Sequence, residues 1–409
     1  MKRARLPLLA VLPVTIISLV VAAPFVVGDH PLQWSSGSLV PHLVLDGKEQ
    51  NRRTGSKNGD GKTSAGTSPT AEVAKVDKEW KPGMPQWGAQ LYWEDNPKHP
   101  LKYVEKQARL QANYLVGLHA NSVSVSFPFF TGKLASTTVS RGDKTPTPDR
   151  LARVLEIFHE AGLRTTIRPL MDEHSLKAEN GWRGAIKPTD RSAWFASYEK
   201  FVAPYLKAAE KEKAATFVIG TELNSLEGDA HWETVVDDAE KLFSGEVAYD
   251  ANWDNYVEGP ITMPVTHLGI DAYFPVKVDD DAPVQDLVDG WNKWLDRKAT
   301  GSLPKITVAE AGIGAMKGAY HAPGDFYTKR AVNPQVQANW YTAVCKVVQE
   351  RKMSGVYWWS IYFDDDPHTK PDDKVASRLD FAGRPLSEKA IKTCFTSDYA
   401  GPGTTTTAS

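Results

Sequence analysis

The sequence lacks the features that mark several classes of protein. Its 409 residues include two cysteines and ten histidines, with no HxH or HExxH pair. We therefore expect neither a catalytic metal nor a cofactor. No glycine-rich phosphate loop follows the first predicted strand, and no tandem repeat is visible. The formal net charge is −2, which gives no electrostatic reason to expect nucleic acid as a partner.

The two cysteines, Cys345 and Cys394, lie in the last two predicted helices. A barrel of alternating strands and helices would place these two helices side by side. If the protein is exported, a disulfide between them is plausible, but two buried free thiols would give the same pattern. The sequence leaves both possibilities open.

Residues 1–27 have the pattern of a signal peptide or a membrane anchor. A basic start, MKRAR, precedes an uncharged apolar run from Leu6 to Val27. That run has about the length of a membrane span, while the Val-Ala-Ala stretch at 21–23 would serve as a cleavage site. Positive charge before the run predicts that the N-terminus stays in the cytoplasm. We favour an anchor, and in either case expect the remainder to be extracytoplasmic, membrane-anchored or secreted.

Composition divides the rest of the chain into three parts. Residues 28–80 are rich in Gly, Ser, Thr, Lys and Asn, a composition that predicts a flexible linker because it buries little apolar surface. Residues 398–409, ending GPGTTTTAS, predict a disordered tail. Between them, residues 81–397 have the composition of an ordinary globular domain, for which we expect a monomer.

Strand-like and helix-like segments alternate through this domain. In the helical stretch TPDRLARVLEIFHEAG, Pro148 stands at a first helical position and Gly162 closes the end. Eight alternations favour a (β/α)8 TIM barrel over the open doubly wound sheet that is the alternative. The predicted strands are 88–93, 121–127, 164–170, 216–220, 246–250, 267–274, 305–310 and 355–363.

Two of these strands finish at a glutamate. The string TFVIGTEL leads into Glu222 after the fourth strand, and KITVAEAG reaches Glu310 at the end of the seventh. In a barrel both side chains open on the same mouth, where active sites are found. Two carboxylates so placed suit a retaining glycosidase, one as general acid and the other as nucleophile. A single strand-end glutamate is more often a helix cap or an ion-pair partner, but two in these positions favour catalysis.

Seven strings give this pattern a family resemblance. Glutamates ending strands four and seven resemble those of glycoside hydrolase clan A, and the whole set resembles family 113, which contains β-mannanases. The strings cover roughly residues 85 to 395, in the order and spacing of that family. They are GWRGAI (181–186), WFASYEKF (194–201), FVIGTEL (217–223), YDANWDNY (249–256), LGIDAYFPV (268–276), VAEAGI (308–313) and VYWWSIYF (356–363).

The resemblance implies roles for individual residues. Glu222 resembles the acid/base and Glu310 the nucleophile, while Tyr273 resembles the residue that hydrogen-bonds the nucleophile. Of Trp358 and Trp359, strand alternation predicts that one points into the mouth beneath the sugar and the other packs outward.

Five further residues resemble substrate contacts, and the two arginines among them also have a structural alternative. Trp182 and Arg183 follow the third strand, and the arginine fork could bridge sugar hydroxyls or pin the loop. Asn252 and Trp253 follow the fifth strand and resemble subsite residues. Arg168 ends the third strand and could hold a catalytic carboxylate, a hydroxyl or a barrel salt bridge.

Two positions depart from the family pattern. Thr221 stands where most of the clan has Asn for the 2-hydroxyl, and Leu170 stands where the family tends to have His. The resemblance implies a retaining β-glycoside hydrolase, an endo-β-1,4-mannanase acting on a plant-type or cell-surface polysaccharide or oligosaccharide. The alternatives are a hydrolase for another β-linked glycan, such as glucan or xylan, and a non-catalytic carbohydrate-binding barrel.

Overall fold

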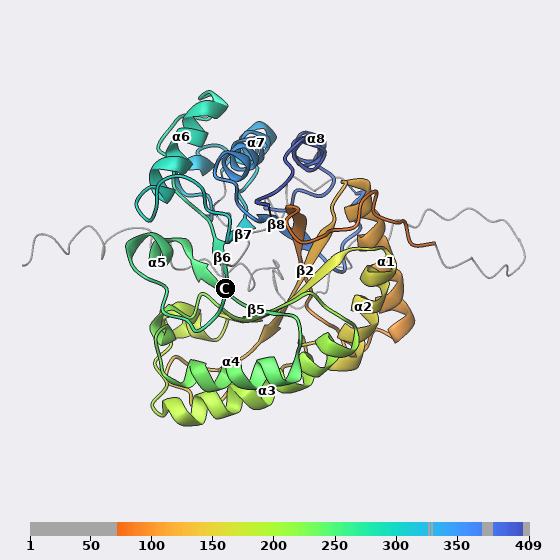
Figure 1. Ribbon diagram of the computed structural model, residues 1–409, viewed down its shortest axis with the longest axis vertical. Coiled ribbons are helices and arrows are strands. Elements are labelled where there is room, and N and C mark those ends of the chain that lie inside the picture. Colours follow the sequence, from red (N-terminus) through yellow and green to blue (C-terminus); the bar gives the residue numbers. More distant parts are fainter. Residues whose placement is uncertain (1–71, 326–327, 329, 370–378, 404–409) are drawn as a thin grey trace, which may run out of the picture.

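Eight parallel strands form a closed barrel (Figure 1). The computed structural model describes residues 72–325, 328, 330–369 and 379–403. Each strand pairs with the next, and β8 pairs with β1, which excludes the open sheet considered above. The strands are β1 (Gln86–Tyr92), β2 (Ser122–Phe129), β3 (Arg164–Met171), β4 (Thr216–Thr221), β5 (Glu246–Asn252), β6 (His267–Asp271), β7 (Ile306–Ala311) and β8 (Gly355–Tyr362).

Helices follow the strands and surround the barrel, as Figure 1 shows. The shortest, α5, begins directly at the end of β5, so this crossover has almost no loop before the helix. The helices are α1 (Leu101–Gly117), α2 (Pro148–Glu160), α3 (Arg191–Lys211), α4 (His231–Leu242), α5 (Trp253–Glu258), α6 (Val284–Leu295), α7 (Pro334–Glu350) and α8 (Pro385–Phe395). This is the (β/α)8 architecture that the alternation of segments predicted.

The helix ends form where local chemistry predicts them. Thr147 caps α2 by accepting a hydrogen bond from the Arg150 amide at 3.3 Å. Pro148 occupies the first turn, where its missing N–H removes no helical bond. Gly162, with φ of 79°, follows α2 in the left-handed conformation that glycine adopts without steric cost. Capping therefore sets both ends of this helix.

The observed strands begin and end within two residues of their predicted bounds, with one exception. The sixth strand was predicted to reach residue 274, but β6 ends at Asp271. One more sheet bond follows, from the Ala272 amide to the Glu310 carbonyl at 2.7 Å. Pro275, which lacks an amide hydrogen, cannot continue a ladder. Tyr273 therefore lies on the loop just beyond β6 rather than within the strand.

The apolar core fills the layer between the strands and the helices. Aromatic side chains dominate on the α3 side, where the rings of Trp194 and Tyr198 stack at 5.2 Å. Inside the barrel the side chains are instead largely polar. Gln90, for example, is buried and donates across the barrel to the Ala309 carbonyl at 2.7 Å. The barrel interior thus accommodates polar side chains and their hydrogen bonds.

The predicted signal or anchor at 1–27 lies outside the described residues. Within the described part of the chain, no helix is both long enough and apolar enough to cross a membrane. Residues 72–80, assigned to the linker from composition, pack on the barrel. The Val76 amide donates to the Ala161 carbonyl at 2.9 Å, and Val73 is buried.

The two cysteines form a disulfide. Cys345 of α7 and Cys394 of α8 are bonded, with their Cα atoms 5.8 Å apart. The two helices pack side by side, as their order in the chain predicted. Of the two possibilities that the sequence left open, the structure has the disulfide.

Candidate active site

Glu222 directly follows β4 and is held in an unusual backbone conformation. Its φ is 52°, in the left-handed region, and its amide donates to the Asp250 carbonyl of β5 at 2.8 Å. Such a conformation costs a non-glycine residue on the order of 1–3 kcal/mol and persists only where the surroundings impose it. The strained backbone aims the side chain at Arg183, whose Nη1 donates to Oε2 at 2.9 Å.

Glu310 owes its direction to irregular pairing at the end of β7. The β7 register shifts against β6 between Ile270 and Asp271, and against β8 beyond Val308. Ala309 lines the barrel interior, so regular alternation would turn Glu310 toward the helices. The shift turns the Glu310 side chain inward as well, where it is 1% exposed.

Both carboxylate oxygens of Glu310 have partners. Arg168 Nη1 lies 2.6 Å from Oε1, and the Tyr273 hydroxyl donates to Oε2 at 2.6 Å. One cationic donor and one hydroxyl donor form an arrangement suited to a carboxylate. The structure thus places Tyr273 where the resemblance implied that it would be.

Arg168 reaches across the barrel from β3 to three carboxylates. Besides Glu310, it donates through Nε to Asp250 Oδ2 at 2.7 Å and through Nη2 to Asp271 Oδ2 at 2.7 Å. Its side chain is fully buried. Burial lowers the pKa of the guanidinium, but Asp271, Glu310 and Asp250 together raise it well above its usual range. Of the roles considered for Arg168, the structure has two, since it holds Glu310 and forms barrel salt bridges.

The same surroundings act on the two aspartates. Burial raises the pKa of Asp250 and Asp271, while the Arg168 guanidinium opposes the rise, and for Asp271 the pKa stays well above its usual range. Three buried carboxylates therefore share the charge of one arginine, and burial holds the pKa of Asp271 high.

Arg183 forms a second clamp, on the loop after β3. Its Nε donates to the Met171 carbonyl at 3.0 Å, and its amide donates to Glu173 Oε1 at 3.1 Å. The guanidinium is fully buried between Glu173 and Glu222. Of the alternatives for Arg183, the structure shows it pinning its loop and bound to Glu222.

The two glutamates differ in their electrostatics. Burial raises the pKa of Glu222 to about 8; Arg183 opposes the rise, and the charges of Glu310 and Glu173 add to it. A pKa of about 8 favours the protonated form of Glu222 at neutral pH, which is the form that a general acid requires. Its partner Glu310 is held by Arg168 and Tyr273. Two carboxyl groups with such different surroundings can divide the work of acid and nucleophile.

The two tryptophans of β8 point in opposite directions. The Trp358 ring lies 4.7 Å from the ring of Tyr341 in α7, on the outside of the barrel. Trp359 pairs with Gln90, an inward residue, and its ring lies 6.0 Å from that of Tyr92. Trp359 is therefore the member of the pair on the inner face, which the sequence did not identify.

Three predicted substrate contacts remain, namely Asn252, Trp182 and Trp253. Asn252 pairs with Asp271 and shares its inward face. Trp182 is 8% exposed, and a side chain at Gly184 would collide with its ring. Trp253 differs, because its ring packs edge-on against Phe274 at 6.0 Å and Trp294 at 5.2 Å. The contacts of Trp253 are thus those of a packing residue.

Sequence reasoning missed three buried acids of this site, Asp250, Asp271 and Glu173. The two aspartates stood inside quoted strings, YDANW and LGIDAYF, but no partner was assigned to them. A buried carboxylate requires a cation or several donors. Two aspartates within apolar strands could therefore have been matched to Arg168 in β3. No comparable signal marks Glu173, since it stands in a loop.

The chain is similar in sequence and in fold to glycoside hydrolases. Residues 93–377 match the model of Glycoside Hydrolase Family 113. A solved GH113 β-1,4-mannanase is 20% identical, with a TM-score of 0.63, over 78% of this chain and 100% of its own. GH113 β-mannanase AaManA from Alicyclobacillus acidocaldarius, in complex with ManMIm, is 20% identical, with a TM-score of 0.61, over 76% and 97%. No curated protein matches the chain.

Proposed function

Since the chain belongs to glycoside hydrolase family 113 and is a glycosidase, we propose that it cleaves β-1,4-linked mannan by double displacement. In this mechanism one carboxylate forms a covalent bond with the sugar, and the other supplies and removes a proton. We assign Glu310 as the nucleophile and Glu222 as the acid/base. The observation that carries the assignment is the contrast between the two carboxyl groups. Glu310 is held by Arg168 and Tyr273, whereas the pKa of Glu222 is raised to about 8.

In the first step, a Glu310 oxygen attacks the anomeric carbon. The bond from that carbon to the leaving oxygen breaks, and Glu222 transfers its proton to the leaving oxygen. The products are an ester between Glu310 and the sugar, an ionised Glu222 and a shortened chain that departs. The raised pKa of Glu222 keeps the proton available at neutral pH for this transfer.

In the second step, Glu222 takes a proton from water. The water oxygen forms a bond to the anomeric carbon, and the ester bond to Glu310 breaks. Two inversions at one carbon give net retention. We expect the carboxyl groups to lie about 5 Å apart, as retaining enzymes require. A crystal structure with a bound inhibitor would measure this separation, and a value near 9 Å would indicate inversion instead.

The surrounding residues fit this assignment. Arg168 and Tyr273 each hold one oxygen of Glu310 in place. Arg183 orients Glu222 through its contact at 2.9 Å. Trp359 is the tryptophan of β8 that could form an apolar floor for a sugar ring, because Trp358 packs against α7. Asn252 shares the inward face and could donate to a hydroxyl.

Mannan is proposed as the substrate because the similar solved structures are those of β-mannanases. Endo action on a plant-type or cell-surface polysaccharide belongs to the same proposal. Glucan or xylan remains the alternative, since Thr221 and Leu170 depart from the family pattern and both side chains are buried beside the site. A panel of soluble mannan, glucomannan, glucan and xylan, with the product lengths measured, tests both substrate and mode. Long products early in the reaction support endo cleavage, and release of single sugars opposes it.

The test of the catalytic assignment compares Glu310→Ala with the parent on soluble mannan. We expect the variant to lose at least about a thousandfold in kcat, because no covalent intermediate can form. Azide should restore turnover in Glu310→Ala by attacking the anomeric carbon directly, and the product then has inverted configuration. Equal sugar release by variant and parent would refute the assignment of Glu310 as the nucleophile, and absence of sugar release by the parent would favour a carbohydrate-binding barrel. Sugar release without azide rescue would place the nucleophile elsewhere.

We also propose that the domain works outside the cytoplasm. The disulfide Cys345–Cys394 supports this setting, because such bonds persist in oxidising compartments. The apolar run at 6–27 supports export, either as an anchor or as a removed signal. Fractionation of cells that express the full chain tests both. Recovery of a reduced, soluble cytoplasmic protein would contradict this proposal. We also propose that the protein is a monomer, which a gel-filtration mass near that of one chain would support.

A further inference from the structure

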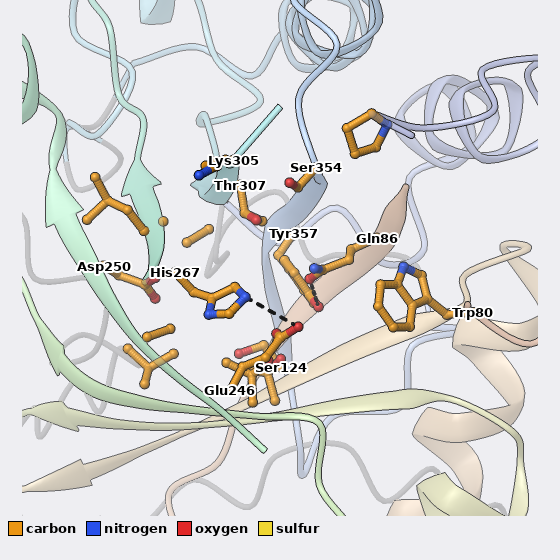
Figure 2. A pocket seen from close by; sticks show the side chains of 18 of the residues that line it. Trp80, Gln86, Ser124, Glu246, Asp250, His267, Lys305, Thr307, Ser354 and Tyr357 are labelled. Carbon is orange, nitrogen blue, oxygen red and sulfur yellow. Dashed lines mark hydrogen bonds and ion pairs between the residues drawn. The ribbon is translucent and has the colours of Figure 1, made fainter. Parts of the chain in front are cut away.

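A cavity of about 490 Å³ opens at the opposite end of the barrel from Glu222 and Glu310. It lies where the strands begin, since Gln86, Thr216, Glu246 and His267 are the first residues of their strands and all line it. Figure 2 shows side chains from several strands surrounding this space. A volume of this size is within the range of sites for small molecules.

The cavity exists because the inward residues here are small. A barrel of this type is usually filled by layers of bulky branched side chains. In this chain the corresponding inward positions carry Ser124, Thr166, Ala248, Gly269 and Thr307. These side chains leave the interior unfilled but line it with hydroxyl groups. The space therefore follows from the choice of inward residues on at least five strands.

Ser124 is the clearest polar group directed at this space. It is 1% exposed, and within the described part of the chain its hydroxyl has no hydrogen-bond partner. A buried hydroxyl without a partner costs on the order of 1–3 kcal/mol. A ligand hydroxyl in the cavity would remove that cost. Ser124 thus indicates a ligand with hydrogen-bonding groups.

Two aromatic rings form part of the wall. Trp80 stands on one side of the cavity in Figure 2, with the Arg164 guanidinium 4.7 Å from its ring centroid. Tyr357 donates to Gln86 Oε1 at 2.8 Å. These contacts hold both rings in place, so that they offer fixed apolar faces beside the hydroxyl groups. Fixed rings and hydroxyls together suit a molecule with polar edges and carbon–hydrogen faces.

The charges in the wall exclude other classes of ligand. Asp250 and Glu246 line the cavity together with Lys305. Arg168 and Arg164 pair with the two carboxylates, so opposite charges offset one another in the wall and favour neither an anion nor a cation. Arg164 is engaged by Glu246 and Thr216. Within the described residues, no group of three His, Cys, Asp or Glu side chains is placed to hold a metal ion. A neutral hydroxyl-rich molecule is the class that fits these walls.

The inner end of the cavity touches the catalytic network. Asp250 lines the cavity and accepts from Arg168 Nε at 2.7 Å. The same guanidinium lies 2.6 Å from Glu310 through Nη1. A ligand that hydrogen-bonds Asp250 would compete for the charge that Arg168 shares between Asp250 and Glu310. Occupancy of the cavity can therefore change the interaction between Arg168 and the catalytic carboxylate Glu310.

We propose that this cavity binds one small, neutral, hydroxyl-rich molecule, a polyol or a monosaccharide, and that its occupancy changes the catalytic rate through Asp250 and Arg168. The site is separate from the substrate mouth, and the ligand enters from the end of the barrel where Trp80 lies.

Direct binding is the first test. The probes are mannitol, myo-inositol and mannose, which represent acyclic polyols, cyclic polyols and aldoses. Crystals of the full barrel soaked with each probe should show it between Trp80 and Ser124. Calorimetry without substrate should give one site for at least one of the three. Ordered water as the sole occupant with every probe, together with absent binding heat, would overturn the proposal.

Variants separate this cavity from the substrate mouth. Ser124→Met should fill the cavity and weaken binding at least about tenfold. Trp80→Ala removes a ring at the more exposed rim, outside the barrel core, and should also weaken binding. Ser192→Met is the matched control, because Ser192 is exposed on α3, and it should bind as the parent does. Equal binding by the parent and both cavity variants would refute the site.

Coupling to catalysis has its own readout. The bound probe should change the kcat of the parent by at least about twofold and leave that of Ser124→Met unchanged. A parent kcat that is unaffected at saturating probe would refute the coupling. Calorimetry uses no substrate, so binding can be established or excluded even if mannan proves to be the wrong polymer.

Discussion

Replacing Arg183 by methionine should move the basic limb of the pH–rate profile upward. In the parent, kcat/KM should fall about tenfold per pH unit above pH 8, because Glu222 loses the proton it must donate and its pKa is about 8. Arg183 lies 2.9 Å from Glu222 and opposes the rise in that pKa. Methionine keeps much of the length of the side chain and removes the charge.

The size of the effect follows from the geometry. Two charges about 4 Å apart interact by about 4 kcal/mol at an effective dielectric constant near 20. That energy corresponds to about three pKa units, which is an upper bound, because water and neighbouring groups compensate for part of the lost charge. The negative charge of Glu173 remains in the Arg183→Met variant, where it continues to raise the pKa of Glu222. We therefore expect the basic limb to move up by at least about one pH unit.

The assay is kcat/KM against pH on a soluble substrate, with melting temperatures recorded to confirm folding. Arg183→Lys is the matched control, because it keeps the positive charge and should leave the limb within about half a unit of the parent. Glu173→Gln should move the limb the other way, to lower pH, because it removes a negative charge near Glu222. A limb that stays near pH 8 in Arg183→Met, or that moves down, would refute the electrostatic assignment of Glu222.

Three further outcomes are expected. Tyr273→Phe removes one donor from Glu310 and should lower kcat about ten- to hundredfold, since a hydrogen bond to a charged group contributes about 1.5–3 kcal/mol; an unchanged kcat would contradict that role. Reduction or Cys345→Ala/Cys394→Ala should lower the unfolding free energy by about 4 kcal/mol for a loop of 49 residues, measured by denaturant titration; equal midpoints would contradict it. Glu222→Gln should gain stability relative to the parent as pH rises from 4.5 to about 8. Over that range the unfolded Glu222 carboxyl ionises while the buried one keeps its proton, so the parent loses up to on the order of 5 kcal/mol that the variant retains; parallel stability curves would contradict the pKa assignment.

Local patterns in the sequence predicted the elements of this fold well, because they depend on local physics. Thr147 and Pro148 start α2, and Asp190 caps α3 by accepting from the Ala193 amide at 2.9 Å. Alternating apolar strands and amphipathic helices leave few ways to bury both faces of a parallel sheet. The barrel, the bounds of its strands apart from the end of β6, and the positions of Glu222 and Glu310 at two strand ends followed from these patterns.

Contacts between distant strands were less accessible to sequence reasoning. Arg168 and Asp271 stand 103 residues apart in the chain, and nothing local pairs them. Which tryptophan of β8 faces inward depends on its pairing with Gln90 in β1. The aromatic packing of Trp253 depends on Phe274 and Trp294, which only the closed barrel brings beside it.

The sequence by itself determined the barrel and the two strands that have a glutamate at their ends, since strand and helix periodicity are properties of neighbouring residues. The tertiary structure alone decided how each glutamate is directed and charged. A register shift turns Glu310 inward beside Ala309, and burial raises the pKa of Glu222 against the opposing charge of Arg183. Direction and charge arise from pairing across strands and from the loss of water around a carboxyl group, and both exist only once the barrel has closed.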